Sequence, residues 1–544
     1  MKGNLRVVLY TLAAGLFFIL WQRWQVANRP VEVSPTLPVA SQTVKKTETL
    51  DQQPPISASE TSEAPDRVRV KTDVLDIAFS TQGASIVEAK LLNYAFTIDN
   101  KSPLTLLHAE NPSRMVFQSG LVSQSGTTAP NHFSQWKSAQ KEYVLPDDAE
   151  HISVPFTWED EHGVRFTKTF TFHRGTYRFE IEETVENQSE RPWQGFAYRQ
   201  IAFGEAAKMG GLGQVATFTG AVTSSEENRY NKIELKDIAS AKKAKLNEVT
   251  QTGWVAMMQH YFLAAVVPQS GVENRLYTQY DNGDHIVGTH DKEVTIAPRD
   301  THHFKSTGYI GPKISKNLSA IAPYLDKTID YGYLFMISQL MFHVMTFIYT
   351  VIGNWGGAII VMTLLIKCLF FVPSAWAYKS MAKMRALQPE INRLKAQYGE
   401  DKQAFSQAMM QLYRDRKVNP ASGCLPMLLQ IPFFIAFYWV LAESVELRHA
   451  PWIGWIQDLS SMDPLYILPI INAALMFLQQ KLNPPPPDPT QAKVMMMMPL
   501  VFGFMFMWFP SGLVLYWTMS NAFSIVQQYV MNKRYGQRVT SAQS

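Results

Sequence analysis

Apolar segments are concentrated after residue 320 of this 544-residue chain, and they constrain its fold more than any other feature. A polypeptide crosses the hydrocarbon core of a bilayer only as a helix or within a closed barrel, so apolar runs of nearly 20 residues predict membrane-spanning helices. Residues before 320 are more polar and predict a soluble region. The apolar runs cover residues 333–372, 424–442, 465–478, 494–509 and 513–531.

A further apolar stretch lies at the N-terminus, from Val7 to Trp21, after Lys2 and Arg6. No small-x-small cleavage site follows it, so we expect an uncleaved signal anchor rather than a cleaved signal peptide. Residues 28–66 are rich in Pro, Ser, Thr, Gln and Glu. Such a composition cannot bury enough apolar surface to order itself, which predicts a flexible linker.

The polar region shows the period-two pattern of half-buried β-strands. Apolar and polar residues alternate over 164–172, a His173-Arg174-Gly175 turn follows, and the alternation resumes over 177–181. This pattern predicts a β-hairpin. Further short strand-like runs, separated by Gly, Pro and Asn turns, predict one large all-β sandwich.

The charges between the apolar runs predict the membrane topology. The run from Tyr333 to Val372 is too long for one span and is interrupted at Gly353-Asn354, while residues 374–422 carry nine Lys and Arg. Cytoplasmic loops are enriched in Lys and Arg, and a double crossing would place all nine outside. We therefore expect an amphipathic helix along the outer interface up to Ile352, followed by one span. This gives six spans with both termini in the cytoplasm.

Two of these spans are short for a membrane. Residues 494–509 would form about 24 Å of helix, against a hydrocarbon core of about 30 Å, and residues 465–478 would form less. Flanking residues could complete both spans. Alternatively, the short helices thin the bilayer locally, which would lower the barrier for another chain to enter.

A single lysine, Lys367, lies within the apolar run Ala358 to Val372, and no Asp, Glu or second basic residue lies in the other apolar runs. An intramembrane charge costs a few kcal/mol and usually marks a functional path. One interpretation is that the side chain extends to the nearer interface. The other is that a water-filled pocket keeps the cation solvated and available to an incoming molecule.

Polar residues in the spans recur at helical spacing. Thr363 lies four residues before Lys367, and Trp517, Ser520, Ser524 and Gln527 share a face of the last span. Gln430 and Asn472 lie in two further spans. These residues would either join neighbouring helices by hydrogen bonds or line a shared hydrophilic groove around Lys367.

Residues 374–422 also predict a helical hairpin with its turn at Gly399 and a net basic surface. It would be either an ordinary solvated helix pair or a docking site for an acidic or RNA-bearing partner or anionic lipid. Its candidate docking residues are Lys379, Lys383, Arg385, Arg393, Arg414 and Arg416.

Motifs for catalysis or cofactor binding are not found in the sequence. It has no phosphate-binding loop, dinucleotide turn or HExxH motif, and His302-His303 lacks spaced partner ligands for a metal. A net charge of +4 gives no reason to expect DNA binding. We expect no enzymatic activity, no cofactor and no metal.

Short motifs in the apolar half resemble a known family. Besides the intramembrane Lys367, they are Gly353-Asn354-Trp355-Gly356, Ser380-Met381-Ala382-Lys383-Met384, Leu387-Gln388-Pro389, Val418-Asn419-Pro420, Gly423-Cys424-Leu425-Pro426, Val445-Glu446-Leu447-Arg448 and the FPSGLVLY stretch from Phe509 to Tyr516. Together they resemble the YidC/Oxa1/Alb3 membrane protein insertases, and most closely YidC of Gram-negative bacteria. The resemblance covers nearly the whole chain.

The resemblance implies a polytopic α-helical membrane protein with a large periplasmic all-β supersandwich. Its five-helix core would enclose a hydrophilic groove that is open to the cytosol and to lipid. The family's groove charge is usually Arg, and Lys367 at that position keeps the charge but loses the bidentate geometry. The implied groove residues are Lys367, Thr363, Gln430, Tyr516, Trp517 and Ser520, and an apolar slide would comprise Ile431, Phe434, Phe504 and Met505.

With this resemblance the chain divides into segments along its length. They are a signal-anchor helix (1–27), a disordered linker (28–66), the periplasmic β-domain (67–320), an interfacial region (321–352), a second transmembrane helix (353–373), the cytoplasmic hairpin (374–422), a third helix (423–442), a periplasmic loop (443–464), a fourth helix (465–480), a cytoplasmic loop (481–493), a fifth helix (494–509), a sixth helix (513–532) and a cytoplasmic tail (533–544).

The implied function is that of an insertase and chaperone of the bacterial inner membrane. Its implied partners are nascent membrane proteins, the Sec translocon (SecYEG and SecDF), the ribosome and signal-recognition machinery on the cytoplasmic side, and the lipid bilayer. Two alternatives stay open. A secondary transporter could use Lys367 as a substrate or proton site. A membrane-anchored carbohydrate-binding protein could use the β-domain, an argument from fold analogy alone.

Overall fold

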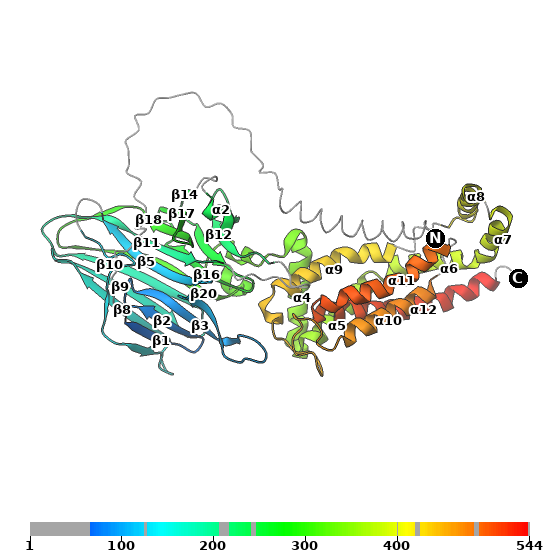
Figure 1. Ribbon diagram of the computed structural model, residues 1–544, viewed down its shortest axis with the longest axis horizontal. Coiled ribbons are helices and arrows are strands. Elements are labelled where there is room, and N and C mark those ends of the chain that lie inside the picture. The colour runs from blue at the N-terminus through cyan, green and yellow to red at the C-terminus, as the bar shows by residue number, and fades with distance from the viewer. Residues whose placement is uncertain are drawn as a thin grey trace, which may run out of the picture.

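The computed structural model describes residues 66–123, 128–205, 217–240, 246–399, 401–418, 425–483 and 489–541. The predicted signal anchor and nearly all of the predicted linker lie outside these ranges. Figure 1 shows an all-β domain and a helical bundle placed end to end along the long axis of the molecule. The predicted architecture, a large β-sandwich followed by a helical bundle, is confirmed, whereas the number of spans stays a prediction.

The β-domain consists of two large sheets. An eleven-stranded sheet has the order β14-β17-β18-β11-β5-β4-β3-β2-β1-β7, with β19 paired to β11, and a nine-stranded sheet has the order β13-β12-β15-β16-β20-β10-β9-β8-β6. The strands are β1 (Arg67–Lys71), β2 (Leu75–Ser80), β3 (Ser85–Ala95), β4 (Pro103–His108), β5 (Met115–Ser123), β6 (Lys137–Ser138), β7 (Glu142–Val144), β8 (His151–Glu159), β9 (Val164–His173), β10 (Arg178–Asn187), β11 (Trp193–Phe203), β12 (Gly220–Ser224), β13 (Asn231–Glu234), β14 (Asn247–Thr250), β15 (Trp254–Met258), β16 (Phe262–Pro268), β17 (Asn274–Asp281), β18 (Asp284–Asp291), β19 (Val294–Ile296) and β20 (Asp300–Pro312). One short helix, α2 (Leu235–Ala239), lies between strands.

Alternation along the strands builds the core between the two sheets. In β9 every second residue from Val164 to Phe172 is buried, and β9 pairs antiparallel with β10 so that Phe172 faces Phe179. The predicted hairpin at 173–175 is therefore confirmed, and Gly175 adopts the positive φ of 68° that such a turn requires. Phenylalanine rings from both sheets meet in this core, as Phe79 and Phe170 do at 4.7 Å between ring centroids.

A charged cluster is also buried in the β-domain. Arg199 of β11 forms ion pairs with Glu183 of β10 and Asp291 of β18, and all three side chains are nearly or fully buried. Lys168 of β9 donates to the carbonyls of Gly83 and Ser119 at 2.8 and 2.9 Å, and burial lowers its pKa to about 7. Because buried charges are tolerated only when paired and hydrogen-bonded, these side chains fix the relative positions of the strands that carry them.

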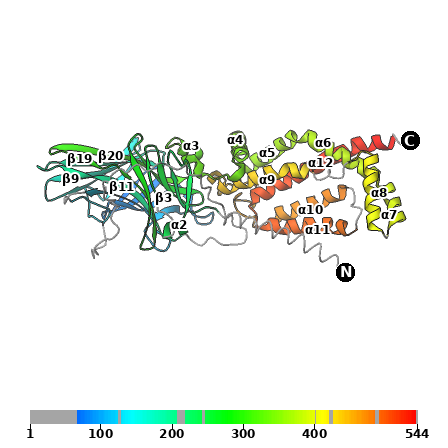
Figure 2. The same ribbon diagram turned by 90° about the horizontal axis from the view of Figure 1, so that it is seen from above.

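A connecting segment leads from the β-domain to the bundle. It contains α3 (Ser315–Ser319) and the 3₁₀ turns η1 (Leu325–Thr328) and η2 (Gly332–Leu334), and it continues into α4 (Phe335–Ile352). By length and composition, residues Gly332–Ile352 could span a membrane. Figure 2 shows α4 at the end of the bundle beside the β-domain, where the long helices begin.

The helical bundle is formed by the helices after α4. They are α5 (Trp355–Leu369), α6 (Phe371–Ala386), α7 (Gln388–Tyr398), α8 (Lys402–Asp415), α9 (Leu425–Glu443), α10 (Ile467–Leu482), α11 (Pro489–Met505) and α12 (Ser511–Ser541), with 3₁₀ turns η4 (Val445–Leu447) and η5 (Phe506–Trp508). Figure 1 shows that α5, α9, α10, α11 and α12 run along the long axis away from the β-domain.

The expected single span over 353–373 is divided in the structure. Helix α5 ends at Leu369, and α6 leaves it with a bend of 65°. Pro373 explains the break, because a proline ring clashes with the carbonyl four residues earlier, which is that of Leu369. A proline within the first turn of a helix is tolerated, so α6 begins where α5 ends.

The expected hairpin over 374–422 is also smaller than predicted. Residues up to Ala386 belong to α6, which packs against α12, and only α7 and α8 form the antiparallel pair. Pro389 lies in the first turn of α7, and the side chain of Asp401 caps α8 by accepting from Gln403 and Ala404. We refer to α7 and α8 as the basic hairpin.

Asn354 connects the start of α5 to the loop after α9, so its replacement should lower the stability of the protein by a measurable amount. Its side-chain oxygen accepts from the Gly357 amide at 2.8 Å, and its amide group donates to the Trp452 carbonyl at 3.0 Å. We expect Asn354→Ala to lower the free energy of unfolding by about 1 kcal/mol through loss of the cap. Unfolding in detergent micelles would measure this, and Asn354→Asp, which keeps the cap, should lose less. An equal loss in both variants would contradict the capping role.

Candidate functional site

Lys367 lies in the last turn of α5, two residues before the helix ends. The C-terminal end of a helix carries a partial negative charge, so a cation is stabilised there. The sequence alone places this lysine deep within an unbroken span, and the break after Leu369 corrects that expectation. The side chain is 9% exposed, so protein atoms surround it.

A chain of hydrogen bonds extends from Lys367 of α5 to side chains of three other helices. Its Nζ donates to the Ser524 hydroxyl of α12 at 2.6 Å, and that hydroxyl donates to the Ser520 carbonyl at 2.8 Å. The Ser520 hydroxyl donates to Oε1 of Gln430 in α9 at 3.3 Å. The Tyr378 hydroxyl of α6 also hydrogen-bonds to Ser524. This polar chain joins α5, α6, α9 and α12.

Among the described residues, no carboxylate forms an ion pair with Lys367, and Ser524 is its hydrogen-bond acceptor. The sequence analysis left open a water-filled pocket around the amine; in the structure the Lys367 side chain is largely enclosed by protein. A hydroxyl is a neutral partner, so no carboxylate among the described residues neutralises Lys367, and the partial negative charge at the end of α5 balances its charge only in part.

Other polar residues of α12 hold the bundle together. Asn521 donates to Oδ1 of Asn472 in α10 at 2.9 Å, and Gln528 donates to Oδ1 of Asn483 at 2.9 Å. These contacts join neighbouring helices by hydrogen bonds, which is the simpler of the two interpretations for polar residues in spans. For α10 and α12 that interpretation is confirmed.

The structure separates the predicted groove residues into two groups. Lys367, Gln430 and Ser520 belong to the polar chain described above. Thr363 is buried and its hydroxyl donates to the Ile359 carbonyl of its own helix at 2.7 Å. Tyr516 is also buried.

Trp517 lies between aromatic rings of two other helical segments. Its ring centroid is 4.6 Å from that of Phe434 and 5.4 Å from that of Phe506. Within the described part of the chain its indole Nε1 is buried without a hydrogen-bond partner.

The predicted slide residues do not share one environment. Phe504 is 62% exposed, and Ile431 and Met505 are also exposed, so these three side chains lie on the outer surface of α9 and α11. Phe434 is half-buried beneath Trp517. An outer surface of apolar side chains contacts lipid in a membrane, whereas Phe434 contributes to the packing of the bundle.

All six predicted docking residues are exposed. Lys379, Lys383 and Arg385 lie on α6, Arg393 lies on α7, Arg414 lies on α8, and Arg416 lies just after α8. Arg416 forms an ion pair with Glu390 at 2.9 Å. The basic hairpin lies at the end of the bundle farthest from the β-domain, as Figure 2 shows.

Ser524, which the sequence places on the polar face of the last span, accepts from Lys367, whereas Tyr378 is a site residue that the sequence does not identify. The spacing of four between Ser520 and Ser524 was a usable signal, because it places both hydroxyls on one helix face. No sequence signal pointed to Tyr378, because the helix predicted after residue 374 was expected in a cytoplasmic hairpin and not packed against α12.

Comparison with known families covers both parts of the chain. Residues 67–344 match the family described as the YidC periplasmic domain, and residues 347–538 match the family described as the 60Kd inner membrane protein. The two matches meet at α4, where the connecting segment enters the bundle.

Several full-length relatives carry the description "Membrane protein insertase YidC". One from Nitrosococcus oceani is 40% identical over 546 residues, which cover 98% of this chain and 99% of the relative. One from Thioalkalivibrio sulfidiphilus is 41% identical over 554 residues, which cover 97% of this chain and 98% of the relative. One from Pseudomonas syringae is 42% identical over 477 residues, which cover 87% of this chain and 84% of the relative. The chain belongs to the YidC family of membrane protein insertases.

Proposed function

We propose that Lys367 and the polar chain around it receive the polar, often acidic flank of a nascent membrane segment. Family membership gives the coarser function, insertion of proteins into the inner membrane without an enzymatic reaction, beside a periplasmic domain. It favours this function over the transporter and carbohydrate-binding alternatives. The observation that carries the proposal is a buried cation whose acceptor among the described residues is a neutral hydroxyl.

The attraction is electrostatic and needs no chemical step. A carboxylate about 4 Å from Lys367 would gain roughly 4 kcal/mol at an effective dielectric constant of about 20. That gain offsets part of the cost of removing the carboxylate from water. The Ser524 hydroxyl keeps its own hydrogen bond to the Ser520 carbonyl when Lys367 no longer donates to it. A client carboxylate can therefore replace Ser524 as the acceptor of Lys367.

The apolar part of the client would then move along the outer surface of α9 and α11. Ile431, Phe504 and Met505 present apolar side chains there. Transfer of apolar surface from water into such a surface and lipid contributes roughly 25 cal/mol per Å². The membrane potential adds a force on charged flanks. Hydrophobic transfer is therefore the main driving force.

The proposed topology places the basic hairpin in the cytoplasm and α4 along the periplasmic interface. Its support is the position of the basic hairpin opposite the β-domain, together with the preference of Lys and Arg for cytoplasmic loops. In this orientation the exposed cations of α6 to α8 can meet the ribosome and signal-recognition machinery. The Sec translocon is proposed as a lateral partner in the membrane.

Photocrosslinking to a stalled nascent chain tests the proposed path. A photoreactive residue at Ile431, Met505 or Trp517 should crosslink to the client, while one at Thr363 should crosslink weakly because that side chain is buried against its own helix. Ile470 of α10 is exposed and lies outside the path, so it provides the matched control. Crosslinks from Ile470 as strong as those from Ile431 would contradict a defined path.

A further inference from the structure

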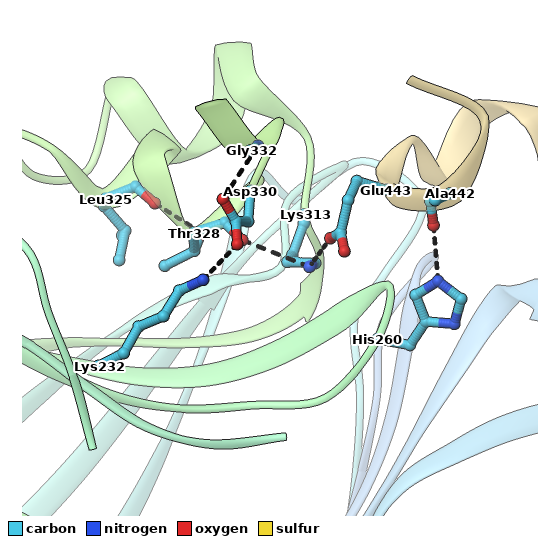
Figure 3. Close-up of polar contacts among 9 residues, drawn as sticks. All are labelled: Lys232, His260, Lys313, Leu325, Thr328, Asp330, Gly332, Ala442 and Glu443. Atoms are coloured by element: carbon cyan, nitrogen blue, oxygen red, sulfur yellow. Dashed lines mark hydrogen bonds and ion pairs between the residues drawn. The ribbon is translucent and has the colours of Figure 1, made fainter. Parts of the chain in front are cut away.

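The C-terminal turn of α9 is held by side chains of the β-domain. Figure 3 shows Lys313, which directly follows β20, with its Nζ 2.7 Å from the carboxylate of Glu443, the last residue of α9. The two side chains are only 1% and 3% exposed. The Lys313 Nζ also donates to the Thr328 carbonyl at 3.3 Å, and its backbone amide donates to the Tyr261 carbonyl at 2.8 Å. Lys313 is thus fixed within the β-domain and paired with the bundle.

A histidine supplies the second contact to the same turn. His260, in the loop between β15 and β16, lies with Nε2 2.6 Å from the Ala442 carbonyl, as Figure 3 shows. A carbonyl only accepts, so Nε2 donates. Burial lowers the pKa of His260 to about 4, so the ring is neutral at pH 7 with its proton on Nε2. The last carbonyls of a helix lack partners within the helix, and His260 satisfies one of them.

A third contact lies just beyond the helix. The guanidinium of Arg448, after η4, donates to the carbonyls of Ala95 and Phe96 at the end of β3, at 2.9 and 2.8 Å. Contacts from β3, from the β15–β16 loop and from the end of β20 therefore converge on one short stretch of the bundle. We refer to Lys313, His260, Ala442 and Glu443 as the clamp.

The energetics of the Lys313–Glu443 pair favour a positioning role over simple stabilisation. Two charges lose their hydration when they are buried, and apolar replacements of both are often no less stable. Such a pair does fix the distance and direction between the elements that carry it. The Lys313 ammonium group also lies at the C-terminal end of α9, which carries a partial negative charge. Their attraction helps to orient α9 relative to the β-domain.

Helix α9 bends most easily in its N-terminal half, away from Glu443. Pro432 lies inside the helix and removes one of its hydrogen bonds, so bending is easiest there. Gln430 and Ile431 lie beside it, about 18 Å from Glu443 along the helix. With its end fixed by the clamp, α9 keeps Ile431 in a defined place relative to α12.

We propose that Lys313 and His260 are positioning residues of the insertase, through which the periplasmic β-domain holds α9 in the path of the inserting segment. This inference rests on the proposed function, because it assumes that clients contact Ile431. It assigns the β-domain a mechanical part in insertion, at the residues where it meets the bundle.

A distance measurement tests the clamp without any client. Spin labels at Ile435 on α9 and Val144 on the β-domain, both exposed, would be placed in the full chain with Cys368 and Cys424 replaced by serine. Lys313→Met should broaden the distance distribution at least twofold. Lys232→Met, which breaks the half-exposed pair with Asp330 in Figure 3, should leave it unchanged. An unchanged distribution in Lys313→Met would overturn the proposal.

Crosslinking then tests the consequence for insertion. In Lys313→Met and in the milder Glu443→Gln, crosslinks to a stalled client from Ile431 should fall at least threefold while those from Phe504 on α11 stay unchanged. The charge exchange Lys313→Glu with Glu443→Lys should restore at least half of the Ile431 yield. Equal losses at both positions, or no loss at Ile431, would overturn the proposal. Failure of the wild-type protein to crosslink at either position would instead refute the proposed function, while the distance measurement still reports on the clamp.

Discussion

Replacing Lys367 by alanine or glutamate should lower insertion of single-span clients with acidic flanks at least tenfold, whereas Lys367→Arg should retain it. At roughly 8 Å and an effective dielectric constant of about 20, one unit charge contributes about 2 kcal/mol to binding of a carboxylate, a factor of about 30. Arginine keeps the charge, and its different geometry matters little for a simple attraction. Reconstituted proteoliposomes with a labelled client would measure this effect.

The design separates loss of function from loss of folding. Lys367 has no ion-pair partner among the described residues, so its removal leaves no carboxylate unpaired. Ser524 keeps its bond to the Ser520 carbonyl. Lys481→Ala on α10 removes an exposed cation outside the polar chain and should insert like wild type. Equal insertion by the Arg, Ala and Glu variants would reject the electrostatic mechanism.

Replacing Arg199 by methionine should destabilise the β-domain by about 3–5 kcal/mol. The change leaves Glu183 and Asp291 buried together without their shared cation. Breaking a buried ion pair from one side costs this much because a desolvated charge stays behind. Burial already raises the pKa of Asp291, so this carboxylate should take up a proton in the variant.

Hydrogen exchange in the full chain would measure this loss. Amides of β10, β11 and β18 should exchange at least a hundredfold faster, and the triple variant Arg199→Met, Glu183→Leu, Asp291→Leu should recover much of the protection. Lys292→Met breaks an exposed pair with Glu273 and should change stability by less than about 1 kcal/mol. Unchanged exchange in Arg199→Met would contradict the role of the cluster.

Local patterns in the sequence predicted the parts of the fold that depend on neighbouring residues. Alternation in β9 and β10 is a property of the pleated strand, so the hairpin at 173–175 could be predicted without any partner. The apolar runs and the flanking cations likewise indicated a helical membrane region. Its position as the single charge in an apolar run identified Lys367, and the family motifs include the same position.

Contacts between distant residues could not be predicted in the same way. Lys367 and Ser524 are separated by 157 residues, and Lys313 and Glu443 by 130. No local spacing specifies such pairs, because they depend on how the helices pack. The end of α5 is a different case, because it could have been predicted from Pro373. A proline is favoured in the first turn of a helix, but this one lies at the end of a continuous apolar run and the break was not predicted.

The bend after α5 determines how deep the cation lies in the bilayer. A straight helix from Trp355 to Ala386 would measure about 48 Å, well beyond the hydrocarbon thickness of about 30 Å. The turn at Phe370 lets the chain leave the membrane instead of projecting far past it. Under the proposed topology, Lys367 lies about 18 Å below the outer end of α5, within the inner leaflet. A client's flank would meet the attracting charge soon after entry, with most of the crossing still ahead of it.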